Sequence, residues 1–399
     1  TAEHFDPENW ADLFQSAGAK FAGPVAQHHD GFAMWGSEVN PWNAQDMGPK
    51  RDILGELFAA LKQRDLKTIA TFHHARHGQR NAQIPENWGR NGYNSHYPYH
   101  PDLPTATTDP LLRKLFGNFE TIEEFHQYWL DQIKEVVDNY DPDVIWFDSW
   151  LNTIPEDLRQ QMAAHYLNHG LETQQELVMC HKQTDLPLDC SVLDIEQGGK
   201  KDIYPLPWMT DITLGQSRWM YVEGHPYKPA DLVIRNMIDV WSKNGVVLLN
   251  VSPRADGVIN QEQRDLLAQI GAWLEVYGEA VYGTRPHSVF GYGPARAPDG
   301  KHGGQSATIA YRAADVRFTV AKDQKSFYVF FLGQPEPGQK VQIRPLGSHR
   351  NCTPSPIKRV IDLGTQQEVE WEMTTETFYV TIPEGEMNPL ANVLKFELE

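Results

Sequence analysis

The sequence predicts an α/β fold, a (β/α)8-like barrel followed by an antiparallel β-sandwich. Two observations carry this prediction. Up to about residue 283, apolar strand-like segments alternate with helical segments, which is typical of a parallel sheet covered by helices. After that point, runs of alternating apolar and polar residues are separated by Gly and Pro, as in antiparallel strands. We therefore expect a barrel domain over residues 1–283 and a β-sandwich over residues 284–399.

The expected helices are marked by their apolar period and by their start and stop signals. Asp6 precedes a Pro in the first turn of the first helix, Trp10, Leu13 and Phe14 give the helical period, and Gly18 ends it. A later helix, within residues 155–170, is expected to close at Gly170. The remaining helices are expected within residues 52–65, 121–140, 228–244 and 260–278.

Seven strands are expected before residue 260, within residues 20–29, 66–74, 142–148, 176–182, 191–196, 207–213 and 245–251. A closed eight-stranded barrel needs one more strand, so we expect the first strand to lie upstream of Thr1. A doubly wound open sheet is the alternative architecture. No glycine-rich phosphate loop follows any of these strands, which disfavours a nucleotide-binding fold. The sandwich strands are expected within residues 318–333, 340–347, 367–383 and 392–399.

Composition excludes several kinds of partner. The net charge is −18, which argues against nucleic acid or an anionic membrane surface. No apolar run is long enough to span a bilayer. The cysteines, Cys180, Cys190 and Cys352, show no CxxC spacing, so we expect neither a zinc scaffold nor a disulfide framework, and no cofactor. The alternation of strands and helices has already begun at Thr1. We therefore expect that a leader has been removed and that the protein is periplasmic or secreted.

Polar residues follow the expected strands at the end where a parallel barrel builds its active site. Two of them, Asp148 and Glu196, are carboxylates on different strands, and paired carboxylates are what glycoside cleavage needs. One carboxylate attacks the anomeric carbon and the other donates a proton to the leaving oxygen. Aromatic rings and histidines suited to bind a sugar accompany them. These are His28, His29, His73, His74, Trp35, Phe72, Trp146, Trp150, Trp208 and Trp219.

Each of these residues also has a structural interpretation. Asp148 is equally suited to cap the helix that follows it, and Glu196 to a solvated loop. His28 and His29 are a candidate metal pair, although neighbouring strand residues point to opposite faces and do not easily bind one ion. One histidine of each His-His pair is suited to the core.

Four ordered motifs resemble glycoside hydrolase family 29, the retaining α-L-fucosidases. They are HHDGFAMW at residues 28–35, PKRD at 49–52, WFD at 146–148 and GVVLLNVSPRADG at 245–257. The resemblance implies that His28 and His29 contact the fucose ring, that Asp148 is the nucleophile and that Trp146 lines the sugar pocket. It also implies a fucosylated oligosaccharide or polysaccharide as substrate. The family's sugar-binding His-Trp pair on the first barrel strand is missing here.

The acid/base residue is the Glu of a "WE" pair in one subgroup of that family, but Trp208 is followed by Met209 here. In the other subgroup, which prefers α-1,3/1,4 linkages, it lies in an ERG-like motif that DIEQGG resembles, with Gln197 in place of Arg. The resemblance therefore points to Glu196, with Asp211 as its rival. A catalytically impaired sugar-binding module is the second interpretation of the whole chain. A metal-dependent hydrolase ranks third, because no HxH or HExxH spacing occurs.

Overall fold

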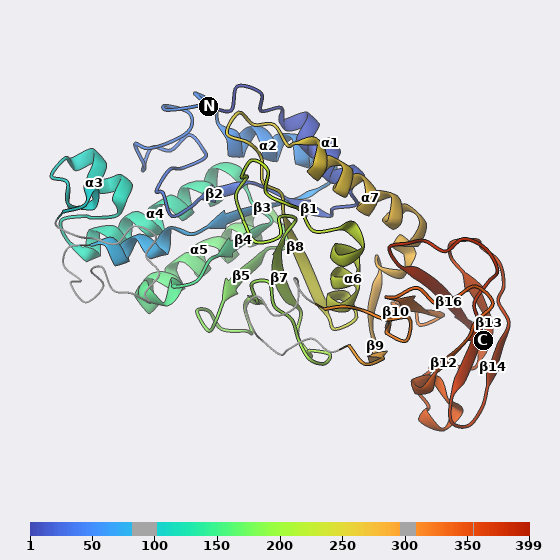
Figure 1. Cartoon of the computed structure of the whole chain (residues 1–399). Coiled ribbons are helices and arrows are strands. Elements are labelled where there is room, and N and C mark those ends of the chain that lie inside the picture. Colours follow the sequence, from blue (N-terminus) through green and yellow to red (C-terminus); the bar gives the residue numbers. More distant parts are fainter. Residues whose placement is uncertain (82–101, 296–308, 354) are drawn as a thin grey trace. The chain divides into compact units, whose positions relative to one another are not determined.

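The computed structural model describes residues 1–81, 102–295, 309–353 and 355–399 (Figure 1). It divides into two compact units. The first unit comprises residues 1–15, 19–193 and 255–258. The second comprises residues 16–18, 194–254 and 259–399.

The first unit contains a parallel sheet in which β3 (Lys67–Phe72) pairs with β4 (Val144–Phe147) and β4 pairs with β5 (Val178–Lys182). On its other edge β3 pairs with both β1 (Phe21–Ala22) and β2 (Val25–Gln27). The single strand expected over residues 20–29 is therefore interrupted. At the interruption, a Cβ on Gly23 would lie 1.8 Å from the carbonyl oxygen of Ile69, so only glycine allows the two backbones to approach this closely.

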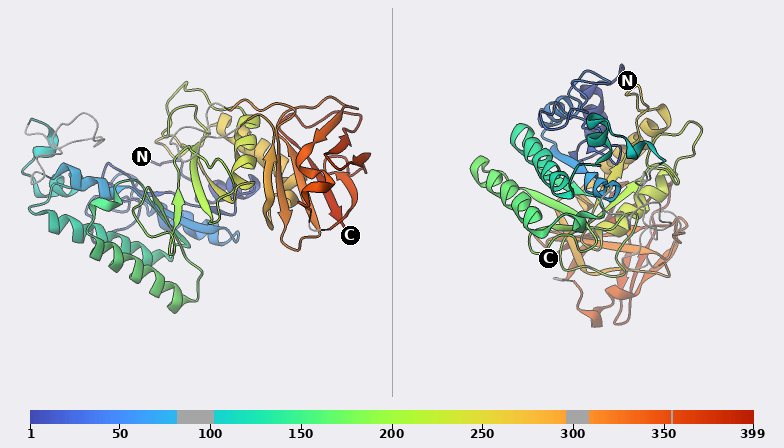
Figure 2. Two further views of the ribbon diagram at one scale, coloured as in Figure 1. Left: turned by 90° about the horizontal axis from the view of Figure 1, so that it is seen from below. Right: turned by 90° about the vertical axis from the view of Figure 1, so that its left-hand side faces the viewer.

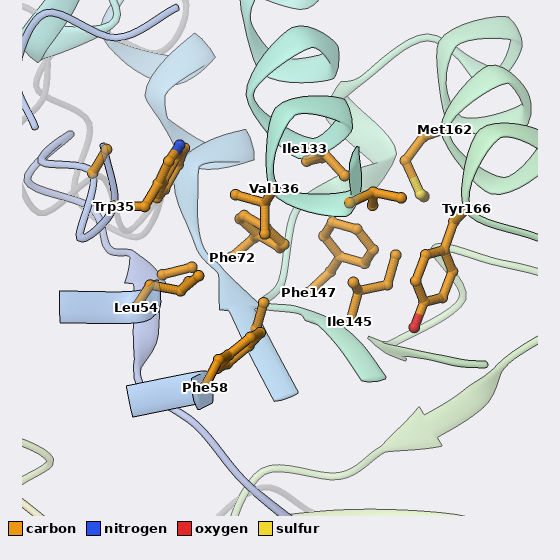
Figure 3. Close-up of a cluster of buried hydrophobic side chains, with 14 of the residues drawn as sticks. Trp35, Leu54, Phe58, Phe72, Ile133, Val136, Ile145, Phe147, Met162 and Tyr166 are labelled. Carbon is orange, nitrogen blue, oxygen red and sulfur yellow. The ribbon is translucent and has the colours of Figure 1, made fainter. Parts of the chain in front are cut away.

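The helices of the first unit are α1 (Pro7–Ser16), α2 (Ile53–Lys62), α3 (Pro110–Phe116), α4 (Ile122–Tyr140) and α5 (Glu156–Thr173). All of them except α3, which has no buried residue, contribute side chains to the core. Asp52 caps α2 and Thr121 caps α4, each accepting a backbone N–H of the first turn. Helices α4 and α5 lie side by side (Figures 1 and 2). Figure 3 shows the buried side chains that α2, α4, α5 and the strands contribute, with Phe72 and Phe147 among them.

One helix end differs from the expected position. Helix α5 does not close at Gly170 but continues to Thr173, and Gln174 ends it with a φ of 57°. Gly170 is instead a packing position, because a Cβ there would lie 2.7 Å from the Leu177 side chain. A glycine in a helical pattern marks either a stop or a close approach, and only the packing distinguishes the two.

The second unit begins with parallel strands β7 (Trp208–Thr213) and β8 (Gly245–Asn250), with helices α6 (Ala230–Trp241) and α7 (Gln261–Tyr277). The boundary between the two units falls within β6 (Val192–Asp194). Each of the seven segments expected to form strands contains a strand, so the predicted alternation of strands and helices is confirmed.

Two antiparallel sheets complete the second unit (Figure 2). The larger has the order β13-β16-β11-β10-β9, and the smaller has the order β12-β15-β14. Phe318 and Phe327 of the larger sheet and Phe378 of the smaller sheet belong to one core cluster, which confirms the predicted sandwich. The bounds are β9 (Thr284–Tyr292), β10 (Val316–Ala321), β11 (Ser326–Phe331), β12 (Lys340–Ile343), β13 (Ile357–Asp362), β14 (Trp371–Met373), β15 (Phe378–Thr381) and β16 (Asn392–Leu398).

The predicted fold class, a parallel α/β fold with a C-terminal antiparallel sandwich, is thus confirmed. The domain boundary between residues 283 and 284 stays a prediction, although β9 begins at Thr284. Among the described residues, no helix is both long and apolar enough to cross a membrane.

Candidate active site

Asp148 lies directly after β4, at the carboxyl end of the first unit's sheet. Its backbone N–H donates to the carbonyl oxygen of Phe72 at 3.0 Å, which extends the pairing of β3 and β4 by one step. The side chain is buried, with 8% of the residue exposed. Because the neighbouring strand fixes its backbone, the carboxylate has a defined direction at the end of the sheet.

Four side chains that carry nitrogen surround the Asp148 carboxylate. His29 Nε2 lies 3.2 Å and His73 Nδ1 lies 3.3 Å from Oδ2. Lys182 Nζ lies 3.2 Å from Oδ1, and Arg76 Nε lies 3.8 Å from Oδ2. The sequence motifs thus bring together His29, His73 and Asp148, as predicted from their strand-end positions.

These neighbours keep Asp148 ionised. Burial alone would raise the pKa of Asp148, but the Lys182 ammonium and the contacts from His29 and His73 outweigh it and hold that pKa well below its usual range. Burial lowers the pKa of His29 to about 4, even though the contact with Asp148 acts in the opposite direction. At neutral pH the site therefore contains an ionised carboxylate beside a neutral imidazole, which suits a nucleophile with sugar-binding groups around it.

Aromatic rings line the same cluster. The ring of Trp146, on β4, lies 5.3 Å from the His73 ring, and Lys182 Nζ lies 4.9 Å from its centroid. Trp150 has a φ of 77°, and Arg76 lies 5.9 Å from its ring. A non-glycine residue in the left-handed region costs free energy, so the segment after Asp148 holds Trp150 in an unusual conformation beside the site.

The exposed His28 completes the histidine group. Its ring centroid lies 4.4 Å from that of His29 and 4.2 Å from that of His73. The expectation that adjacent His28 and His29 face opposite ways is wrong, because β2 ends at Gln27 and strand alternation stops there. Each of the three histidines offers a ring nitrogen, and these nitrogens lie within 4.8 Å of one another.

Two other predicted residues of this unit lie in its core. His74 is fully buried among Phe72 and Trp129, and its Nε2 donates to the carbonyl oxygen of Trp129 at 3.3 Å. Trp35 is also fully buried, and its indole N–H donates to Glu135 at 2.8 Å. The structure therefore does not bring these two side chains to the Asp148 cluster, and their predicted sugar contacts stay predictions.

The remaining predicted residues belong to the second unit. Glu196 is half-buried in a turn after β6, where the backbone N–H of Gln197 donates to the carbonyl oxygen of Asp211 at 2.9 Å. Asp211 is buried within β7 and does not end it, because β7 continues to Thr213. Trp208 is fully buried, with its indole N–H on the carbonyl oxygen of Lys243, and Trp219 is half-buried after β7. Their predicted roles stay predictions.

Sequence reasoning missed two charged residues of the site, Lys182 and Arg76. Lys182 is the last residue of β5, so its position at the end of a buried strand was the available signal. Arg76 lies in a 3-10 helix over His74–Arg80, just beyond the strand expected within residues 66–74. The end of a strand can be recognised from the apolar pattern of the sequence. A contact between a cation and a carboxylate far apart in the sequence cannot.

A second buried carboxyl group lies in the same unit. Burial raises the pKa of Asp185 to about 6, although its Oδ2 accepts the backbone N–H of Leu151 at 3.2 Å. Leu151 directly follows Trp150, so Asp185 holds the segment that leads away from Asp148. We assign it a structural role, because only 1% of the residue is exposed.

A parallel sheet with a buried, ionised carboxylate at the carboxyl end of a strand is the arrangement of an α/β enzyme. The α-L-fucosidase family model matches residues 1–279, and the chain therefore belongs to this family.

Individual relatives agree with this assignment. The chain is 25% identical to plasma α-L-fucosidase of Pongo abelii over 366 residues, which cover 85% of the chain and 64% of that protein. It is 28% identical to tissue α-L-fucosidase of Rattus norvegicus over 299 residues, 72% of the chain and 58% of that protein. The chain thus spans about three fifths of the length of these relatives.

A solved structure is similar along nearly the whole chain. The Thermotoga maritima α-fucosidase in complex with fucose matches with a TM-score of 0.73 and 27% identity, covering 99% of this chain and 80% of the other. α-L-Fucosidase isoenzyme 1 of Paenibacillus thiaminolyticus, at 21% identity and a TM-score of 0.73, shows the same fold.

Proposed function

We propose that this chain is an exo-acting, retaining α-L-fucosidase that releases terminal α-linked L-fucose from fucosylated oligosaccharides or polysaccharides. The observation that carries the proposal is Asp148, ionised at the end of β4 and in contact with His29 and His73. Membership of the α-L-fucosidase family and the similarity to an enzyme crystallised with fucose support the choice of sugar.

The proposed mechanism is a double displacement. Asp148 attacks the anomeric carbon and forms an ester to it, while the glycosidic bond breaks and Glu196 gives its proton to the leaving oxygen. Glu196 then takes a proton from water, the water oxygen attacks the same carbon, and the ester bond to Asp148 breaks. Two inversions give net retention. These steps use carboxylates and water and require no metal ion.

The histidines have the chemistry to read the sugar hydroxyls. A neutral imidazole offers one donor and one acceptor, and a hydroxyl offers the same pair. His28 is exposed at the edge of the cluster, whereas His29 and His73 are positioned beside the nucleophile. We propose that they bind fucose together, with Trp146 against the apolar face of the ring.

The first test compares substrates and the nucleophile variant. The wild-type chain is expected to hydrolyse an aryl α-L-fucoside and to act much more slowly on an aryl α-L-galactoside. Asp148→Ala is expected to lose about 10³-fold or more of kcat, because no group remains to form the ester. Added azide should partly restore turnover and give the inverted fucosyl azide.

The matched control is Asp143→Ala, since Asp143 is a buried carboxylate at the opposite end of β4. It accepts bonds from Lys67 and Thr68, so its loss is expected to lower stability and leave azide without effect. Near wild-type turnover by Asp148→Ala would remove Asp148 from the mechanism. Binding of fucose with no turnover by the wild-type chain would favour the alternative, a catalytically impaired sugar-binding module.

A further inference from the structure

The two ring nitrogens of His29 have different neighbours. Its Nδ1 lies 3.1 Å from the carbonyl oxygen of His73, and a carbonyl oxygen only accepts. Nδ1 is therefore held by the backbone, and Nε2 is the ring nitrogen that lies toward Asp148 Oδ2, 3.2 Å away.

His29 Nε2 and Asp148 Oδ2 are both atoms that a divalent ion can bind, and they lie close together. His73 Nδ1 lies 3.3 Å from the same oxygen, and the three histidines offer nitrogens within 4.8 Å of one another. In a tetrahedral site with bonds of about 2.0 Å, neighbouring ligand atoms lie about 3.3 Å apart. The two nitrogen-to-oxygen distances match this edge length, and His28 offers a third nitrogen within 4.8 Å of those of His29 and His73.

His29 also has the second hydrogen bond that is typical of a metal-binding histidine. A histidine that binds a metal almost always donates its second ring N–H to a carboxylate, a water or a backbone carbonyl, which fixes the tautomer and the ring direction. The bond from Nδ1 to the His73 carbonyl oxygen provides this support. Three imidazoles and one carboxylate form a donor set that suits Zn²⁺.

We propose that His28, His29, His73 and Asp148 form an inhibitory site for a zinc-type divalent ion. Such an ion would occupy the nucleophile's oxygen and the nitrogens assigned to the sugar, so ion and sugar exclude each other. Lys182 and Arg76, both beside Asp148, oppose a cation, which predicts micromolar rather than structural affinity. The binding stands on the geometry alone, whereas the inhibition rests on the proposed function.

The test is isothermal titration of the metal-free chain with ZnCl₂, in a Cys190→Ser background that removes the exposed thiol. We expect one saturable site in the micromolar range. His28→Ala and His73→Ala should each weaken it about tenfold or more. The control His165→Ala removes an imidazole on α5 that contacts Asp138, and it should leave the affinity unchanged. Thermal melts in EDTA verify that each variant folds.

Two outcomes would overturn the proposal. One is the absence of a saturable site, and the other is an affinity that His28→Ala and His73→Ala both leave unchanged. L-Fucose added to the calorimeter cell is expected to weaken zinc binding. In the activity assay, zinc should raise the KM for an aryl α-L-fucoside at constant kcat. If the chain binds zinc through these histidines but hydrolyses no fucoside, the metal site stands and the proposed function fails.

Discussion

Lys182 governs the charge of the proposed nucleophile. Its Nζ lies 3.2 Å from Asp148 Oδ1, and among the groups that lower the pKa of Asp148 it contributes most. An acid must lose its proton to attack, so activity falls as the pH drops through the pKa of Asp148. Because this pKa is low, we expect the proposed activity to persist well into the acidic range.

The substitution Lys182→Gln is expected to raise the pKa of Asp148, because it removes the nearby positive charge that favours the ionised carboxylate. The acidic limb of kcat/KM should therefore move to higher pH. The check is a pH profile that extends far enough into the acidic range to include the limb of the wild-type chain. Lys67→Gln, which removes an exposed lysine bound to Asp143, is the control and should not move the limb. If the acidic limb of kcat/KM stays at the same pH in Lys182→Gln, the charge of Lys182 does not influence the pKa of Asp148.

Glu196 is the second residue whose role is open to a kinetic test. If it donates the proton to the leaving oxygen, Glu196→Ala should reduce turnover of poor leaving groups by about 10²-fold or more and affect activated aryl fucosides much less. The basic limb of its pH profile should also disappear. Asp211→Ala is the comparison, since the backbone carbonyl oxygen of Asp211, in β7, accepts the N–H of Gln197 and Asp211 therefore lies beside the turn that contains Glu196. If only Asp211→Ala shows this pattern, the two roles are exchanged.

Single residues also show where sequence reasoning reaches its limit. Asp148 was predictable, because a carboxylate after an apolar strand stands out from its surroundings. The HHD and FHH stretches gave the right histidines, but the sequence did not distinguish His73, which faces Asp148, from His74, which faces Trp129. Two adjacent residues of one type carry no difference in pattern, and only the packing of α4 against the 3-10 helix that begins at His74 separates them.

At the scale of elements, α4 organises the segment that follows His29. Glu135 of α4 accepts the Trp35 indole N–H at 2.8 Å, the Ser37 hydroxyl at 2.5 Å and the backbone N–H of Glu38 at 2.6 Å. One carboxylate thus satisfies several donors of residues 35–39, and Trp35 among them is fully buried. This explains why Trp35 lies in the core rather than beside the sugar.

Glu135→Ala is expected to lower the free energy of unfolding by about 2–4 kcal/mol, since it leaves a buried indole N–H without its acceptor. Glu123→Ala, an exposed glutamate of the same helix, should change it by less than about 0.5 kcal/mol. Denaturant unfolding measures both. We also expect Glu135→Ala to lower kcat/KM, because the segment begins next to His28 and His29. Equal stability of the two variants would show that α4 does not hold this segment.

Element types were predictable to a greater degree than element ends. The apolar strands gave a clear period, but the break between β1 and β2 depends on how closely Gly23 approaches Ile69, which is a distance between strands. Helix α3 was not predicted, although Asp109 caps it and Gly117 ends it with a φ of 70°. A helix of seven residues has too few turns to show an apolar period.

At the scale of the whole molecule, the sandwich strands are joined to the helices that precede them. Within the second unit, Asp239 and Lys243 lie 2.7 Å apart at the end of α6, and Arg317 of β10 lies 2.5 Å from Asp239. All three side chains are buried. Trp273 of α7 donates its indole N–H to the carbonyl oxygen of Ala391 at 2.9 Å. The sequence change at residue 283 therefore marks a change of architecture across which buried contacts continue.

A chain shortened to residues 1–283 tests this point. It would remove Arg317 from the buried Asp239 and would uncover Trp273, so we expect aggregation or no cooperative thermal transition. In the full-length chain, Arg317→Ala is expected to lower the free energy of unfolding by about 3–5 kcal/mol, because a buried carboxylate loses a cation that contacts it. Calorimetry with light scattering measures the first effect and denaturant unfolding the second. A soluble fragment that melts at the temperature of the full chain would show that the barrel part folds without the sandwich.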